Sequence, residues 1–236
     1  RCLWLAGFVA EHVIYLSRHY ENTGAYPNNH YLSNITGVLF GAAYLLKNHP
    51  MEETNTTMDV IYRDALTRLT AEVERQVHAD GFDYEHSTYY HSFVTELLVE
   101  TVGMLERNGK EYPPTLAMVC RKMLTVCCCI GAFDNRMPLI GDQDGSRLFH
   151  LAGCFDIDRC DFSHLARYAT DGDDLANSAS AGIYYLHGEE LSVYFKCGDI
   201  GTAGYGTHDH NDQLSISVFV GGQALVIDSG TYVYTA

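Results

Sequence analysis

The chain has 236 residues, of which 47% are hydrophobic and 19% are charged, a composition typical of a globular protein. The 15 Lys and Arg residues face 30 Asp and Glu residues, and the formal net charge of −15 argues against a nucleic-acid partner and against highly charged anionic ligands. Since no apolar run is long enough to cross a bilayer, we expect no membrane span.

Helical periodicity runs through the first part of the chain. Apolar residues recur at helical spacing in four segments, and residues 1–20 are predicted to be helical as well; the four segments are 31–48, 58–77, 91–109 and 113–133. Glu11 and His12 interrupt the apolar N-terminal residues, which do not have the pattern of a signal peptide. The loops between the segments favour antiparallel helix pairs.

Strand-like alternation follows in the last part of the chain. Turn residues replace the helical pattern after residue 136, and apolar residues alternate with period two after residue 180. Two strands joined by a turn are predicted in "GIYYLHGEELSVYFKCG" at 182–198, and "QLSISVFV" and "QALVIDSG" are predicted to form a hairpin around Gly221-Gly222. We expect an antiparallel sheet that packs on a second sheet.

The predicted organisation is α+β and multidomain, with helices first and strands second. A helical domain is expected at 1–135, a connecting segment at 136–178, and an antiparallel β-domain at 179–236 that is incomplete at its C-terminus. Because the chain lacks an initiator Met and stops within a strand-like pattern, we expect a piece of a longer protein.

Eight cysteines are present, and three of them are consecutive at 127–129, inside a helical pattern. No CxxC motif occurs, so we interpret most of them as buried free thiols. A disulfide between Cys154 and Cys160 in an oxidising compartment remains an alternative.

The first polar cluster, "PNNH", lies just before a predicted helix. Asn28 or Asn29 alone would suit a helix N-cap. Together with His30, however, the two amides supply neutral donors that could bind a carboxylate.

The second cluster, "DGFDYEHSTYYHSF" at 80–93, is rich in tyrosine and histidine. Within it, five aromatic or imidazole side chains occur close together: Tyr84, His86, Tyr89, Tyr90 and His91. One interpretation is a surface loop with aromatic residues packed on the helices. The other is a sugar-binding or acid–base site, because tyrosine offers both a flat apolar face and a phenol.

The third cluster, "PLIGDQDGSR" at 138–147, contains Asp142, Asp144 and Arg147. It is too short for a calcium loop and lacks the closing Glu, so we interpret it as a structural turn.

The fourth cluster, "HDHNDQLSISVFVGGQALVIDSG" at 208–230, combines imidazole and carboxylate groups that suit zinc. On a strand, His208 and His210 would point to one side. A two-residue hairpin, however, would put Asp228 opposite Ser215, roughly 17 Å along the strand from His210. Shared ligation of a metal therefore requires a bend before the strand, which the glycines at 201, 204 and 206 permit.

Four segments resemble, in this order, the signature segments of heparinase II/III-like polysaccharide lyases: "NNHYLSNITGVLFGAAYL", "DGFDYEHSTYYH", "PLIGDQDG" and "THDHNDQLSISVFVGGQALVIDSGTYVY". The resemblance covers most of the chain. It implies an incomplete helical (α/α) toroid of helix pairs followed by an antiparallel β-sandwich. It also implies β-elimination on a uronic-acid polysaccharide.

The resemblance assigns roles to four residues. Asn29 and His30 match the pair that neutralises the uronate carboxylate, Tyr90 matches the catalytic tyrosine, and His208 matches the catalytic histidine. Which of Tyr90 and His208 acts as base and which as acid stays open. Further substrate contacts are expected from the neighbouring residues Asn28, Tyr84, Tyr89 and His91.

The resemblance also implies a Zn²⁺ cofactor that shapes the site. His210 and Asp228 match two of its ligands, and the third, a histidine, is expected beyond residue 236. Some members of the family carry a Glu where this chain has Ser33. The substrate is therefore left open.

Three alternatives follow from these observations. A lyase is favoured because the three polar clusters occur together, and its acidic net charge favours a weakly charged uronate polymer over a highly sulfated one. A non-catalytic glycan-binding relative or an inactive fragment is the second. The third, a glycoside hydrolase, would need a pair of carboxylates that is not evident here. We expect the cell envelope, the periplasm or the exterior as the location, and the oligomeric state stays open.

Overall fold

The computed structural model describes residues 2–22, 24–48, 52–131, 137–144, 147–148 and 180–231. The chain forms two compact units, residues 1–75 with 97–117 (unit 1) and residues 76–96 with 118–236 (unit 2). Most of the predicted connecting segment, with Cys154 and Cys160, lies outside the described residues.

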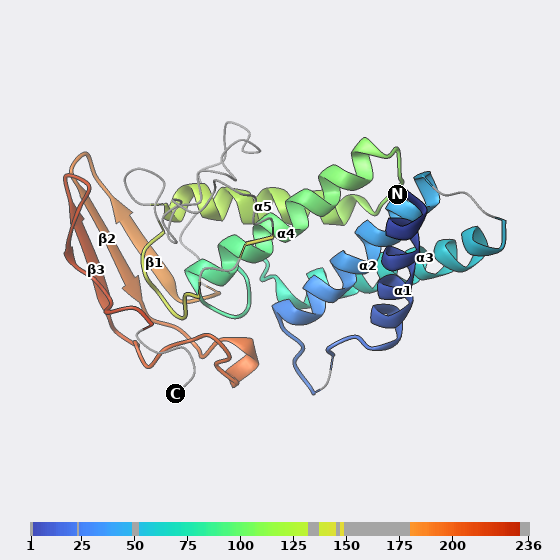
Figure 1. Cartoon of the computed structure of the whole chain (residues 1–236). Coiled ribbons are helices and arrows are strands. Elements are labelled where there is room, and N and C mark those ends of the chain that lie inside the picture. The colour runs from blue at the N-terminus through green and yellow to red at the C-terminus, as the bar shows by residue number, and fades with distance from the viewer. Residues whose placement is uncertain are drawn as a thin grey trace. The chain divides into compact units, whose positions relative to one another are not determined.

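Within the described residues the predicted helices are confirmed and precede the strands (Figure 1). They are α1 (Cys2–Arg18), α2 (Asn29–Asn48), α3 (Glu52–Gln76), α4 (Thr88–Arg107) and α5 (Pro114–Ile130). Helix α3 begins at Glu52, earlier than the predicted start at residue 58. The prediction missed the first turns because they are polar and contain no apolar stripe.

Helix α2 has a deeply buried apolar face. Its apolar residues follow the predicted spacing, and Leu32, Ile35 and Leu39 are completely buried. Helix α1 packs against α2. The helical pattern of the sequence therefore identifies the buried face of this helix correctly.

The strands form one antiparallel sheet in the order β1-β2-β3-β4, part of which is labelled in Figure 1. The strands are β1 (Ile183–His187), β2 (Leu191–Lys196), β3 (Ile216–Val220) and β4 (Gln223–Val226). Both predicted hairpins are present, and Val220 pairs with Gln223 across the Gly221-Gly222 turn.

The two faces of this sheet differ. On one face Ile183, Tyr194 and Lys196 are buried. The other face is also apolar but open, with Leu186, Leu191 and Ile216 at 72%, 46% and 47% exposure. In a β-sandwich, an apolar face of one sheet is covered by the other sheet.

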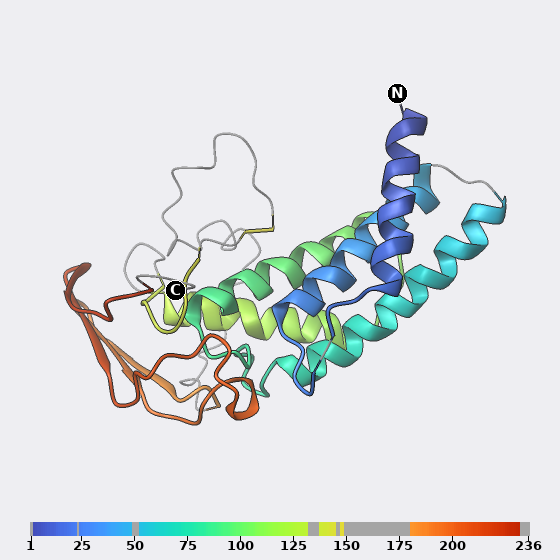
Figure 2. The same cartoon turned by 60° about the horizontal axis from the view of Figure 1, so that its bottom comes forward.

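The connection between β2 and β3 positions the predicted site. It leaves the sheet after Lys196, passes through a short 3-10 helix at Thr202–Gly204 and returns at Ile216, as the orange segment in Figure 2 shows. His208 and His210 therefore lie in irregular backbone before β3, and the expectation that they share one side of a strand is wrong.

The predicted bend is present, and a β-bulge between Val218 and Phe219 adds to it. Strand β4 ends at Val226, so Asp228 leaves the ladder and its Oδ1 lies 3.9 Å from Nδ1 of His210. The separation of roughly 17 Å that a regular hairpin would impose does not arise.

Candidate functional site

His208 lies at the centre of the polar cluster in unit 2. Its ring stacks on that of Tyr90, with centroids 3.6 Å apart and planes inclined by 10°. A carboxylate lies near each ring nitrogen: Glu85 is 3.2 Å from Nε2 and Asp142 is 3.3 Å from Nδ1. Two residues predicted from separate motifs, Tyr90 and His208, are thus in direct contact.

The neighbouring His210 contacts the same aspartate. Its Nε2 lies 2.9 Å from Oδ1 of Asp142, whose carboxylate therefore links the two histidines. The hydroxyl of Thr231 also approaches this oxygen, at 3.3 Å. Sequence reasoning missed this role of Asp142, because its partners are more than sixty residues away along the chain.

Close backbone approach makes this arrangement possible at Gly141. Its φ is +75°, and a Cβ there would lie 2.6 Å from the carbonyl oxygen of His208 and 2.9 Å from Cβ of Ser87. The amide of Asp142 donates to the same carbonyl at 2.9 Å. Glycine therefore allows the segment around Asp142 to reach the His208 loop.

Asp209, which lies between His208 and His210 in the sequence, contacts different partners from those of the two histidines. Its Oδ1 lies 3.2 Å from Nζ of Lys196, and its Oδ2 accepts the Gly201 amide at 2.8 Å. The Lys196 side chain is completely buried and also donates to the carbonyl of Ala181. The buried ion pair of Lys196 and Asp209 therefore anchors the loop at the residue between His208 and His210.

Two further histidines of the second cluster are buried and structural. The His91 ring accepts the Asp83 amide at Nδ1 and contacts the Met123 carbonyl through Nε2, and burial lowers its pKa to about 4. Burial likewise lowers the pKa of His86 to about 4, and its Nε2 lies 2.9 Å from Nε2 of His78. Backbone groups thus lie at both nitrogens of His91, and the substrate contact expected of this residue stays a prediction.

Tyr84 and Tyr89 are as deeply buried as Tyr90, with 5%, 3% and 3% exposure. The ring of Tyr89 meets that of Tyr90 edge to face at 6.2 Å. The substrate contacts expected of Tyr84 and Tyr89 remain predictions.

The first cluster belongs to unit 1. Asn28 lies at the N-cap of α2, where its Oδ1 accepts the His30 amide at 3.1 Å. Asn29 is buried, whereas His30 is exposed and pairs through Nδ1 with Glu21 at 2.8 Å. The N-cap interpretation thus holds for Asn28, and the carboxylate-binding roles of Asn29 and His30 remain predictions.

His210 belongs to a group of three potential metal ligands. The ligand atoms of His210, Asp212 and Asp228 all lie within 4.8 Å of one another. The gap of 3.9 Å between Nδ1 of His210 and Oδ1 of Asp228 is longer than a hydrogen bond but shorter than a Zn–N and a Zn–O bond in line, which together span about 4.0–4.3 Å. The predicted pair of ligands therefore fits zinc.

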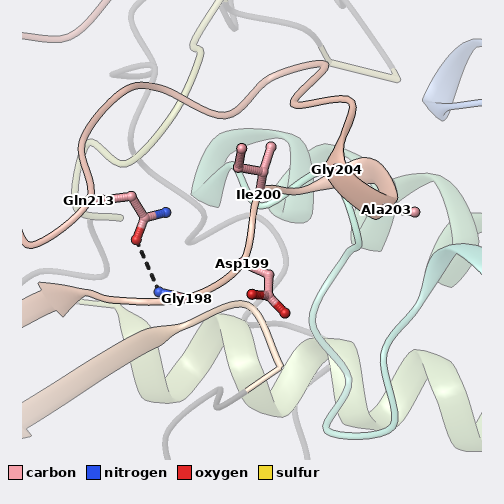
Figure 3. Close-up of a pocket in the computed structure, with 6 residues that line it drawn as sticks. All are labelled: Gly198, Asp199, Ile200, Ala203, Gly204 and Gln213. Atoms are coloured by element: carbon pink, nitrogen blue, oxygen red, sulfur yellow. Dashed lines mark hydrogen bonds between the residues drawn. The ribbon is translucent and has the colours of Figure 1, made fainter.

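An open pocket of about 540 Å³ lies on the β2–β3 connection (Figure 3). Its polar groups are the Asp199 carboxylate and the Gln213 amide, whose Oε1 accepts the Gly198 amide at 3.1 Å. None of the predicted site residues lines this pocket.

Among the described residues, no helix is long and apolar enough to span a membrane. The five cysteines with described thiols are all free, as predicted, but only Cys120 and Cys127 are buried, whereas Cys128 is exposed.

The chain is similar to named proteins over most of its length. It is 26% identical over 131 residues to the heparin-sulfate lyase of Pedobacter heparinus, a match that covers 55% of this chain and 18% of that protein. A crystal structure of a mutant heparan sulfate lyase HepC from the same organism superposes with a TM-score of 0.68 at 21% identity, over 95% of this chain and 35% of that one. A crystal structure of heparinase III gives 0.71 at 17% identity, over 99% and 39%.

These structural neighbours share the fold and confirm the expected toroid and β-sandwich architecture, although the chain spans well under half the length of each. Residues 3–150 match the model of the heparinase II/III N-terminus, and residues 170–236 match the heparinase II/III-like C-terminal model. The chain therefore belongs to the heparinase II/III-like family of polysaccharide lyases.

Proposed function

We propose that the full-length protein cleaves a uronic-acid-containing polysaccharide by β-elimination. The observation that carries this proposal is the stacked pair of Tyr90 and His208, with a carboxylate at each nitrogen of the imidazole. The names of the matched relatives, a heparin-sulfate lyase and a heparinase, support the same reaction class.

The reaction removes the C5 proton of a uronate and breaks the bond between C4 and O4. Electrons of the C5–H bond form the C4–C5 double bond, and the departing O4 takes up a proton. Because the proton lies next to a carboxylate, the intermediate is enolate-like and requires nearby donors to mask its charge.

The surroundings of His208 favour Tyr90 as the base. A carboxylate lies at each nitrogen of the imidazole, and because a carboxylate only accepts hydrogen bonds, these neighbours favour the ring as a donor. Such a donor beside the stacked Tyr90 would stabilise a developing phenolate. We assign His208 the part of electrostatic partner and proton donor to O4.

Asn29 and His30 are proposed to mask the uronate carboxylate, as the family motif implies. The two side chains present an amide and an imidazole, which donate hydrogen bonds without a fixed positive charge. The His30 ring is accessible, and its pairing with Glu21 lies at the surface.

Zn²⁺ is the proposed cofactor, with His210 and Asp228 as ligands. When bound, the ion would order the loop that carries His208, since His210 lies two residues away. Asp142 contacts both histidines and so connects the metal ligand with the reacting pair.

We propose that the substrate is a weakly charged uronate polymer. We also propose that the protein acts in the cell envelope or outside the cell. Five carboxylates lie in or beside the cluster, whereas the Lys196 ammonium is buried and already paired; the five are Glu85, Asp142, Asp209, Asp212 and Asp228. Such surroundings repel sulfate groups. Tight binding of heparin at moderate salt would contradict this choice.

The test is a panel of sulfated and unsulfated uronate polymers incubated with the full-length protein. Ultraviolet absorbance of the C4–C5 unsaturated product should rise on at least one unsulfated polymer. The Tyr90→Phe variant should lose about 10²–10⁴-fold in kcat while keeping its circular dichroism, because it lacks the phenol that moves the proton. Activity that survives this substitution removes Tyr90 from the mechanism.

Glycan binding without turnover is the second candidate. The deep burial of Tyr90 and His208, with 3% and 5% exposure, favours it. It would be supported by polymer binding without any unsaturated product.

A further inference from the structure

We infer that Asp212 is a third ligand of the metal site, so that three ligands come from residues 210–228 of this chain. The family resemblance leads to His210 and Asp228, with a histidine beyond residue 236, and assigns nothing to Asp212. The inference rests on the proposed metal site but not on the proposed reaction.

The Asp212 carboxylate is buried and has no hydrogen-bond partner within the part of the chain that the structure describes. The residue is 9% exposed, and among the described residues neither carboxylate oxygen takes part in a hydrogen bond. Buried polar groups in folded proteins almost always have a partner, and an unsatisfied carboxylate is especially unfavourable. One of these oxygens lies within 4.8 Å of the ligand atoms of His210 and Asp228.

The orientation of His210 supports a cation at this place. Its Nε2 faces the Asp142 carboxylate at 2.9 Å, and since a carboxylate only accepts, Nε2 carries the hydrogen. The Nδ1 lone pair is thereby left towards Asp228, 3.9 Å away. Metal-bound histidines usually donate their second N–H to a carboxylate in this way.

The donor set indicates the kind of ion. One imidazole nitrogen and two carboxylate oxygens match three protein ligands of a zinc site, with a fourth position for water or for the histidine expected further along the chain. Lys196 provides one positive charge nearby, but its ammonium is already paired with Asp209. A divalent cation would balance the remaining carboxylates.

The first experiment measures zinc affinity of the full-length protein without substrate. Chelator-stripped protein is titrated with Zn²⁺ against a chromophoric competitor, with Asp212→Asn, Asp228→Asn and Asp199→Asn compared with the wild type. Asp228 is the predicted ligand, and Asp199 is an exposed carboxylate on the same connection. We expect Asp212→Asn and Asp228→Asn to weaken zinc binding at least about tenfold and Asp199→Asn to change it less than about twofold.

Wild-type affinity and stoichiometry in Asp212→Asn, or no zinc binding by the wild type, would overturn the inference. If Asp212→Asn does not fold, anomalous diffraction at the zinc edge, measured on crystals of the wild type, tests the assignment of Asp212 instead. A zinc peak about 2.0–2.2 Å from an Asp212 oxygen supports the inference, and a peak bound by His210 and Asp228 without Asp212 refutes it.

Parallel lyase assays separate this inference from the proposed function. Loss of zinc in Asp212→Asn, with no unsaturated product from the wild type, leaves the ligand assignment intact and refutes the reaction. If the wild type forms the unsaturated product and Asp212→Asn binds as much zinc as the wild type, the proposed reaction is supported and the assignment of Asp212 is refuted.

Discussion

Two histidine–carboxylate pairs lie in different units and in opposite surroundings. In unit 1, His30 meets Glu21 at 2.8 Å with side-chain exposures of 51% and 60%. In unit 2, His208 meets Glu85 at 3.2 Å with exposures of 7% and 0%. The shorter pair is the weaker one, because water screens it and both side chains give up mobility to form it. Burial, and not distance, decides how firmly each imidazole is held.

Of the two histidine–carboxylate pairs, the buried one at Glu85 should give the larger effect when it is broken. Glu85→Gln keeps the shape but removes the charge facing Nε2 of His208. Hydrogen bonds to charged groups contribute about 1.5–3 kcal/mol, so kcat on the unsaturated-product assay should fall about 10–150-fold. Glu21→Gln is the matched control at the exposed pair. An equal loss of kcat in both variants would contradict the difference between the buried and the exposed pair.

The buried ion pair beneath the His208 loop offers the next test. Lys196→Met leaves the Asp209 carboxylate buried without its cation, which should lower the free energy of unfolding by about 3–5 kcal/mol in urea titrations. The exposed Lys47, which donates to Asn108, is the control, and Lys47→Met should cost less than about 1 kcal/mol. Unchanged stability in Lys196→Met would mean that the pair is not ionised.

Acid should weaken unit 2 through its buried neutral histidines. Burial lowers the pKa of His91 in the folded state to about 4, below its usual value of 6.5, so the unfolded chain binds more protons between these values. The stability that His91 contributes is present above pH 6.5 and is lost as the pH falls towards 4, with about 2 kcal/mol lost between pH 7 and 5.

Burial raises the pKa of Asp83, which acts in the opposite direction, so the total slope is a sum. The comparison of wild type and His91→Gln in urea at pH 7 and 5 isolates the histidine. An identical pH dependence of the two proteins would contradict a neutral, buried His91.

The smallest effect is expected at the surface pair. Glu21→Gln should change the free energy of unfolding by less than about 1 kcal/mol, because exposed ion pairs contribute little. If His30 binds the uronate carboxylate, this variant should also leave KM no higher than in the wild type. A rise of KM would show that Glu21 orients His30 for the substrate.

The helices and strands could be predicted because their signals are local. The spacing of Leu32, Ile35 and Leu39 identifies the buried face of α2, and Gly221-Gly222 identifies the hairpin. The first turns of α3 were not predictable from apolar periodicity, since they contain no apolar stripe. The residue type and motif of His91 do not reveal that backbone groups lie at both of its nitrogens, because those contacts are made by tertiary structure.

The sequence by itself determined the order of helices and strands and the motifs that carry Tyr90, His208, His210 and Asp228. Only the tertiary structure decided that Asp142 links the two histidines, that Glu85 faces His208 and that the Asp212 carboxylate lies beside His210 and Asp228. Most of these contacts join residues far apart in the chain, and irregular backbone, which has no periodicity to predict it, brings them together. The close approach at Gly141 shows how strictly such backbone depends on a distant segment.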